Sequence, residues 1–242
     1  MKKNVVALGF FDGVHLGHAA ILRAAVSLAR QLGMTPAALT YERPPRALTR
    51  GSAPLLLTEP DRRAALMRAC GVEHVFVLPF TPEFAALSPE QFVEEILVRE
   101  FNCGGVVCGE DFRFGKSASG DTAALRLLCG ARGIALSVCP PVLRDGRAVS
   151  STAVRAAVAE GDVREAAALL GRPYALRLWR GADGLYRAPE GMALPPNGAY
   201  IVSLGGTAAQ PIWFDATGSI LSGGEESLDL AFLDREMHTT GR

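Results

Sequence analysis

The sequence predicts an α/β fold, with a Rossmann-like parallel sheet followed by a small C-terminal β unit. Three observations support this. Five short runs are almost continuously apolar, as in strands covered on both faces. Stretches with helical spacing separate them, and this alternation is typical of parallel strands joined by right-handed crossovers. After about residue 174 the helical signals stop. The expected strands are residues 5–10, 36–41, 74–80, 105–109 and 134–139.

Helix starts and stops are readable between these strands. Thr58, Ser88 and Asp162 are N-cap residues, and the last two have Gln or Glu three positions later, the pattern of a capping box. Gly71 and Gly171 mark helix ends. In sheets of this kind, ligands bind at the carboxyl ends of the strands, beside the helix starts.

The last part of the chain has a different texture. The runs ALRLW, AYIVSL, PIWF and LDLAFL are separated by clusters of Gly, Pro, Asn and Asp. This pattern predicts short strands joined by turns. We therefore expect two domains, residues 1–174 and residues 175–242.

Composition excludes several classes of function. The chain has 25 Lys and Arg against 25 Asp and Glu, so no net field favours nucleic acid or an anionic membrane surface. No apolar run reaches membrane-spanning length, and no signal peptide is evident. The five cysteines form no CxxC or Cys/His spacing, which predicts thiols in a reducing compartment and no structural zinc. We expect a cytoplasmic protein, and the sequence indicates no oligomeric state.

The stretch GFFDGVHLGH at residues 9–18 contains two of the four histidines. It follows the first strand and leads into a helix whose apolar face includes Leu22 and Ala29. His15 and His18 should therefore lie at a helix start, where free N–H groups and the dipole favour phosphate. Gly17 leaves room for a ligand. Structural capping of the helix is the alternative, whereas a metal pair lacks a third ligand.

The HLGH string resembles the HxGH signature of the nucleotidyltransferase superfamily. The full ten-residue string resembles the FMN adenylyltransferase module of bacterial bifunctional riboflavin kinase/FAD synthetases. Three more stretches agree in the same order: residues 80–97 (FTPEFAALSPEQFVEEIL), residues 109–121 (GEDFRFGKSASGD) and residues 149–155 (VSSTAVR), the last followed by LGRPY. The resemblance covers residues 4–174.

The resemblance implies transfer of AMP from ATP to FMN, giving FAD and pyrophosphate. Phosphoryl transfer of this kind needs positioning and charge neutralisation rather than a protein nucleophile. The expected catalytic residues are His15, His18, Ser151, Thr152 and Arg155. The expected ATP-binding set is Gly9, Phe10, Phe11, Asp12, Gly13, His15, Gly17, His18, Ser150, Ser151, Thr152 and Arg155, with Asp12 as a turn former rather than a base. Mg²⁺ would be held through the ATP phosphates.

The loop at residues 109–121 resembles the flavin-side loop of the family. The residues expected to bind flavin are Asp111, Phe112, Phe114, Gly115 and Lys116. The phenylalanines could wall the isoalloxazine ring, and Lys116 could meet the FMN phosphate. Read without the resemblance, the same stretch is a surface loop anchored by two phenylalanines.

The chain departs from the family pattern in two places. Members typically read FEPHP after the second strand, where this chain has YERPPR with Pro44 at the histidine position. Bifunctional members also carry a riboflavin kinase barrel with a Pro-Thr-Ala-Asn motif, which residues 175–242 lack. We therefore expect a degenerate, truncated remnant of that barrel without kinase activity.

Other functions remain open at this stage. The same fold could serve a different nucleotidyl acceptor, or the protein could be a non-catalytic flavin-nucleotide sensor. A class I aminoacyl-tRNA synthetase is disfavoured because no KMSKS-like segment is present.

Overall fold

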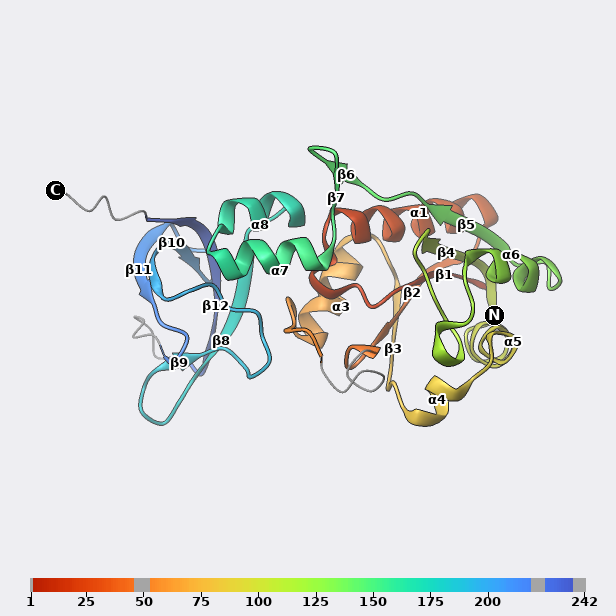
Figure 1. The fold of residues 1–242 in the computed structure, drawn as a ribbon, viewed down its shortest axis with the longest axis horizontal. Helices are drawn as coiled ribbons and strands as arrows, with labels where there is room; N and C mark the ends of the chain where they lie inside the picture. The colour runs from red at the N-terminus through yellow and green to blue at the C-terminus, as the bar shows by residue number, and fades with distance from the viewer. Residues whose placement is uncertain (1, 46–52, 219–224, 237–242) are drawn as a thin grey trace. The chain divides into compact units, whose positions relative to one another are not determined.

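The computed structural model describes residues 2–45, 53–218 and 225–236. The chain forms two compact units. The first comprises Met1–Pro54 and Pro60–Ala148, and the second comprises Leu55–Glu59 and Val149–Arg242. Figure 1 shows the elements of each.

The first unit is built on a five-stranded parallel sheet, as predicted. Its strand order is β3-β2-β1-β4-β5, so β1 lies at the centre. The chain adds β2 and β3 on one side of β1 and then β4 and β5 on the other, so the order in which strands are added reverses between β1 and β4. Carboxyl ends of the central strands flank such a reversal, the point where ligands bind in open α/β sheets. The strands are β1 (Asn4–Leu8), β2 (Thr35–Tyr41), β3 (His74–Leu78), β4 (Cys103–Gly109) and β5 (Ala135–Cys139).

The predicted N-cap at Ser88 is confirmed, whereas the helix expected directly after Thr58 begins at Pro60. Ser88 forms a complete capping box with Gln91. The segments are η1 (Asp12–Val14), α1 (Leu16–Leu32), α3 (Pro60–Ala69), α4 (Pro82–Ala86), α5 (Pro89–Gln91), η2 (Phe92–Glu100), η3 (Lys116–Ala118) and α6 (Thr122–Gly130). A two-stranded hairpin, β6 (Leu143–Arg144) with β7 (Arg147–Ala148), was not predicted.

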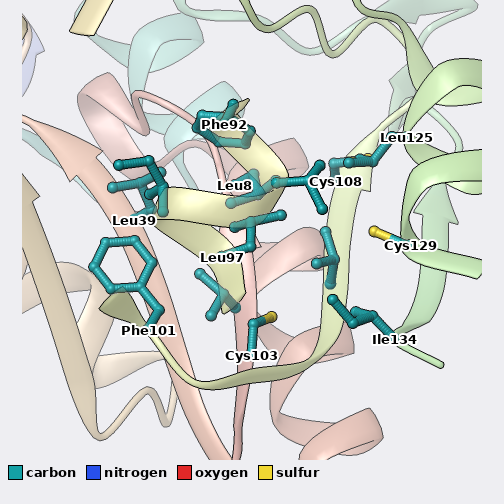
Figure 2. Packing of buried hydrophobic residues seen from close by; sticks show 14 of the residues in the cluster. Leu8, Leu39, Phe92, Leu97, Phe101, Cys103, Cys108, Leu125, Cys129 and Ile134 are labelled. Carbon is teal, nitrogen blue, oxygen red and sulfur yellow. The ribbon is translucent and has the colours of Figure 1, made fainter. Parts of the chain in front are cut away.

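Apolar cores cover both faces of the sheet. On one face, Ala7 and Val107 of the sheet pack with Leu22 of α1 and Met67 of α3. On the other face, the alternate strand residues pack with residues of η2 and α6, and Figure 2 labels ten residues of this cluster. Each fully buried leucine or phenylalanine contributes roughly 1.5–3 kcal/mol. The two covered faces explain why the central strands are continuously apolar.

Two expectations about this unit need correction. The edge strands β3 and β5 are only partly buried, because an edge strand lacks a neighbour on one side. The helix expected after Ser88 is π-helical over η2, where the N–H of Phe101 donates to the carbonyl of Ile96, five residues back (3.0 Å). A π-turn widens the helix locally, and such segments often occur near functional sites.

The second unit combines two helices and an antiparallel sheet. The helices α7 (Ser151–Glu160) and α8 (Val163–Leu170) contact each other (Figure 1). The sheet has the order β11-β10-β12-β8-β9, which confirms the predicted β unit. Its strands are β8 (Tyr174–Arg180), β9 (Tyr186–Arg187), β10 (Gly198–Leu204), β11 (Gln210–Phe214) and β12 (Ser227–Arg235).

The segment Leu55–Glu59 belongs to the second unit through backbone pairing. The N–H of Leu56 donates to the carbonyl of Gly191 (2.7 Å), and the N–H of Ala193 donates to the carbonyl of Leu56 (2.8 Å). The boundary expected at residue 174 coincides with the start of β8. The division into domains at residue 174 stays a prediction. The two compact units divide earlier in the chain, after Ala148.

Buried thiols give a first testable prediction. Burial raises the pKa of Cys103 and Cys108 to about 12 and that of Cys129 to about 11. Almost no thiolate therefore exists at pH 8, and the three side chains are buried. We expect Ellman's reagent at pH 8 to react rapidly with no more than the two partly exposed cysteines, Cys70 and Cys139. All five should react after unfolding in guanidinium, and rapid labelling of three or more in the folded protein would contradict the packing.

Candidate functional site

The turn after β1 has an unusual backbone conformation. Phe11, Gly13 and Val14 all have positive φ angles, of 57°, 79° and 39°. Gly13 adopts its angle freely, but the two other residues are held in a conformation that side chains disfavour. The N–H of Val14 donates to the carbonyl of Phe11 (3.0 Å), and Asp12 is buried within the turn, as expected for a turn former. Strained residues of this kind persist where the surrounding packing fixes them, often at functional sites.

His15 is the N-cap of α1, so the predicted position of the two histidines at a helix start is confirmed. Its Nδ1 accepts a hydrogen bond from the backbone N–H of His18 (3.3 Å). An Nδ1 that accepts cannot carry a proton, so neutral His15 has its proton on Nε2, which is then a donor. Capping and ligand contact are therefore compatible, because they use different ring nitrogens.

The rings of His15 and His18 stack face to face, with centroids 3.7 Å apart and planes inclined by 20°. The rings of Phe11 and His18 pack edge to face, with their centroids 5.2 Å apart. His18 is therefore packed from two sides. His15 is 5% exposed, and His18 is half-buried. Gly9 leaves just enough room for the Phe11 ring, and Gly17 is the second residue of α1. The arrangement places two packed imidazoles beside the first N–H groups of a helix.

The turn is attached to β2 by a buried hydroxyl. Thr40 Oγ1 donates to the carbonyl of Phe10 (2.7 Å), and Thr40 has no exposed surface. This hydrogen bond joins the carboxyl ends of two adjacent strands. Pro44, where the resemblance led us to expect histidine, is also buried, and Arg46 lies outside the described residues.

Arg63 of α3 is a residue that the sequence analysis missed. It is fully buried, its Nη2 donates to the carbonyl of Tyr41, and its Cζ lies 4.4 Å from the centre of the Phe10 ring. Burial lowers its pKa to about 10, and the charge of Asp12 opposes that shift. The guanidinium therefore remains charged at neutral pH. One signal was available: Arg63 lies four residues before the apolar Met67, on the face that α3 buries.

The loop predicted to bind flavin follows β4. Phe114 is buried in the core and contacts Phe92 with ring centroids 5.3 Å apart, whereas Phe112 is only partly buried and stacks on Phe114 (5.8 Å). Asp111 and Lys116 are exposed. Phe114 thus anchors the loop, and Phe112 is the ring that remains partly accessible.

The tip of this loop is held by backbone hydrogen bonds. Phe114 and Gly120 exchange two of them (3.0 and 2.9 Å), and the N–H of Lys116 donates to the carbonyl of Leu87 (2.7 Å). Ser117 and Ala118 both have positive φ angles, 56° and 57°. A tip of fixed but strained shape is typical of a binding loop.

Gly115 supports a mutational prediction. Its φ of 73° and ψ of 176° are accessible almost only to glycine, and a Cβ would lie 2.9 Å from the backbone nitrogen of Pro89. We expect Gly115→Ala to lower the free energy of unfolding by about 2–3 kcal/mol. The flavin-binding role predicted for this loop from the sequence adds the expectation that the variant binds FMN more weakly. Thermal unfolding and FMN titration would measure both effects.

Gly130 is a matched control for that variant. It ends α6, and an added Cβ meets nothing within 4 Å. Gly130→Ala should be neutral or stabilise by about 0.5–1 kcal/mol. Equal behaviour of the two variants would show that the loop tolerates a side chain at residue 115, contrary to the geometry.

The residues of the SSTAVR motif lie in the second unit, at the start of α7. Ser150 is the N-cap and accepts from the N–H of Ala153 (3.2 Å), while Val154, Ala157 and Val158 form the buried face. Both features were predicted. Ser151 and Thr152 occupy the first turn, and Arg155 Nε donates to the carbonyl of Leu55 (2.6 Å).

Within residues 2–45, 53–218 and 225–236, no group of three or more His, Cys, Asp or Glu side chains is placed to hold a metal ion. Among the helices of these same ranges, none combines the length and the apolar character needed to span a bilayer.

Comparison with known proteins gives a consistent result. The model of the FAD synthetase family matches residues 1–153. A bifunctional riboflavin kinase/FMN adenylyltransferase from Listeria monocytogenes is 36% identical over 173 residues, which are 71% of this chain and 54% of that protein. An FAD synthetase from the same organism is 32% identical over 174 residues, covering 72% of this chain and 70% of that protein.

Two further matches extend over the C-terminal region. The bifunctional riboflavin kinase/FMN adenylyltransferase of Escherichia coli K12 is 30% identical over 253 residues, covering 98% of this chain and 80% of that protein. A crystal structure titled as a macrolide-efflux protein from Streptococcus pneumoniae matches the fold with a TM-score of 0.86 at 24% identity, covering all of this chain and 88% of that one. This structural likeness concerns the fold alone.

Proposed function

The chain belongs to the FAD synthetase family, and on that premise we propose that it transfers AMP from ATP to FMN, forming FAD and releasing pyrophosphate. The observation that carries the proposal is the paired His15 and His18 at the start of α1. In the reaction, a phosphate oxygen of FMN attacks the α-phosphorus of ATP. The bond from that phosphorus to the bridging oxygen of the β-phosphate breaks, and pyrophosphate leaves with its electron pair.

The chain's own residues would bind and orient the triphosphate. The Nε2–H of His15 is a donor because its Nδ1 is occupied, and His18 is held against it. Both would donate to phosphate oxygens as charge builds on the departing pyrophosphate. The first N–H groups of α1 add the favourable end of the helix dipole.

The second helix start supplies further groups. Ser151, Thr152 and Arg155 of α7 would bind phosphate oxygens of ATP, as the family resemblance implies, with Arg155 providing a permanent positive charge. Mg²⁺ would arrive with the nucleotide, since a cation with oxygen ligands binds phosphates and water readily. When bound, it supplies neutralisation of the phosphate charge.

The loop after β4 would bind the flavin. Phe112 offers a partly exposed ring edge, Lys116 an exposed cation, and Asp111 an exposed carboxylate for a polar edge of the ring system. Phe114 would anchor the loop because its side chain is buried. Gly115 would fix the loop's shape because its backbone conformation is one that glycine alone adopts easily.

We also propose that the C-terminal β unit is a remnant of the riboflavin kinase barrel without its activity. The chain spans 80% of the bifunctional E. coli protein, and the alignment runs into this region. Yet residues 175–242 contain no Pro-Thr-Ala-Asn sequence. A structural or docking role would then account for the well-packed sheet, with Tyr200, Phe214 and Phe232 at its centre.

A single assay tests both proposals. Purified protein is incubated with Mg²⁺ and ATP, separately with FMN and with riboflavin, and the flavins are separated by HPLC. FAD from FMN, together with no FMN from riboflavin, is the expected result. Binding of FMN without release of pyrophosphate would instead indicate a sensor. Formation of FMN from riboflavin would contradict the proposal that the C-terminal β unit has no kinase activity.

A further inference from the structure

Arg63 presents a buried charge whose hydrogen bonds are incomplete. Its side chain has no exposed surface, and only Nη2 has an acceptor, the carbonyl of Tyr41. Nε and Nη1 are buried and have no hydrogen-bond partner among the residues that the structure describes. Buried polar groups are nearly always paired, and an unpaired charged donor is costly. Such a group therefore requires an explanation.

The position of Arg63 connects it to the proposed ATP site. The Phe10 ring covers one face of the guanidinium at 4.4 Å, and Asp12 is close enough to interact with its charge. Both residues belong to the turn that carries the HLGH helix start. A ring on the face leaves the planar edge of a guanidinium available, and that edge carries the N–H donors.

A purely structural role explains these observations poorly. A methionine or leucine could fill the same space between α3 and the sheet without burying a charge. Replacing buried charges by apolar groups of similar volume is often neutral or stabilising. Asp12 only partly offsets the burial, as the lowered pKa of Arg63 indicates.

We propose that Arg63 is a substrate-binding residue, and that its Nε–H and Nη1–H groups donate to phosphoryl oxygens at the carboxyl ends of β1 and β2. Nε–H shares one edge of the guanidinium with Nη2, and Nη1 shares the other edge with Nη2. Each of the two unpaired groups can therefore make a charged hydrogen bond to a phosphate oxygen, on a different edge. Because the side chain is fully buried, the contact includes a local adjustment of the turn over it. ATP and FMN both carry phosphoryl oxygens, and this inference rests on the proposed function for its choice of ligands.

The test uses Arg63→Met and Arg63→Lys in the full chain, with Arg68→Met as the matched control. Arg68 lies on the same helix but is exposed. Dissociation constants for ATP and for FMN are measured separately by calorimetry with Mg²⁺ present, and the melting temperature is measured with and without each ligand. Steady-state kcat and KM follow for both substrates.

The expected result has two parts. Arg63→Met should weaken the binding of one of the two ligands roughly ten- to a hundredfold, the size of a lost charged hydrogen bond. Its melting temperature without ligand should stay equal or rise, while the increase caused by that ligand shrinks. Arg63→Lys should lie between wild type and Arg63→Met, because it keeps the charge and loses the planar edge. Arg68→Met should match wild type.

Several outcomes would overturn the inference. Unchanged dissociation constants for both ligands in Arg63→Met would do so, and so would a lowered melting temperature with unchanged binding, which would identify a structural residue. If Arg63→Met does not fold, Arg63→Lys decides by the same criteria. The ligand whose dissociation constant changes, ATP or FMN, is the one that Arg63 binds. The proposed function fails separately, if wild type binds ATP and FMN but forms no FAD.

Discussion

Replacing His18 by alanine is expected to lower kcat for FAD formation by roughly two to three orders of magnitude, the usual effect of removing one donor to developing charge. The loss should fall mainly on kcat, because the donor matters most as pyrophosphate departs. The fold should survive. The His15 side chain, not that of His18, caps α1, and the backbone N–H of residue 18 remains in the variant. Steady-state kinetics with FMN and ATP would measure the effect.

His74→Ala is a suitable control for that measurement. His74 is an exposed residue at the start of the edge strand β3, outside the turn. Its replacement should leave kcat and KM within about twofold of wild type, as surface substitutions usually do. A folded His18→Ala protein that keeps more than half of the wild-type kcat would remove His18 from the catalytic site.

Much of the fold was predictable because its signals are local. The five apolar runs became strands, and Ser88, Asp162 and Ser150 cap helices as their sequence context indicates. The helix start at His15 was equally readable, because an apolar strand, a glycine turn and an amphipathic helix follow each other within a short stretch.

Features that depend on distant contacts were not predictable in the same way. The pairing of Leu56 with Gly191 and Ala193 joins segments far apart in the chain and assigns Leu55–Glu59 to the second unit. The partial exposure of β3 follows from its place at the sheet edge, which the strand's own sequence does not contain. The π-helical conformation of η2, whose Phe92 and Leu97 are buried in the core, also has no signal in the capping pattern that predicts the helix.

The candidate site shows the same division. Phe112 and Phe114 look alike in sequence, but only Phe114 packs against Phe92 in the core. Arg63 reads as one of three charged residues in a row at the start of a helix, where solvent exposure is the usual outcome. Its burial beneath Phe10 arises from the packing of α3 against η1 in the turn after β1, a tertiary contact.

Arg155→Met is expected to lower kcat/KM for ATP roughly a hundredfold, because a guanidinium donating to phosphate contributes both charge and paired hydrogen bonds. Arg155→Lys should recover part of that loss, since the charge remains but the planar geometry does not. The structure requires a second measurement. Arg155 Nε also donates to the carbonyl of Leu55, so a loss of activity could follow from loosening of the Leu55–Glu59 segment.

The melting temperature separates the two effects of Arg155. A charged hydrogen bond to one backbone carbonyl contributes roughly 1.5–3 kcal/mol, so a purely structural role predicts lower stability with little change in KM for ATP. A role in triphosphate binding predicts a higher KM for ATP in variants that still melt cooperatively. Arg164→Met is the control, because its exposed ion pair with Asp234 in the same unit contributes little. Equal kinetics of Arg155→Met and Arg164→Met would exclude the α7 start from the ATP site and leave the triphosphate to the residues of the first unit.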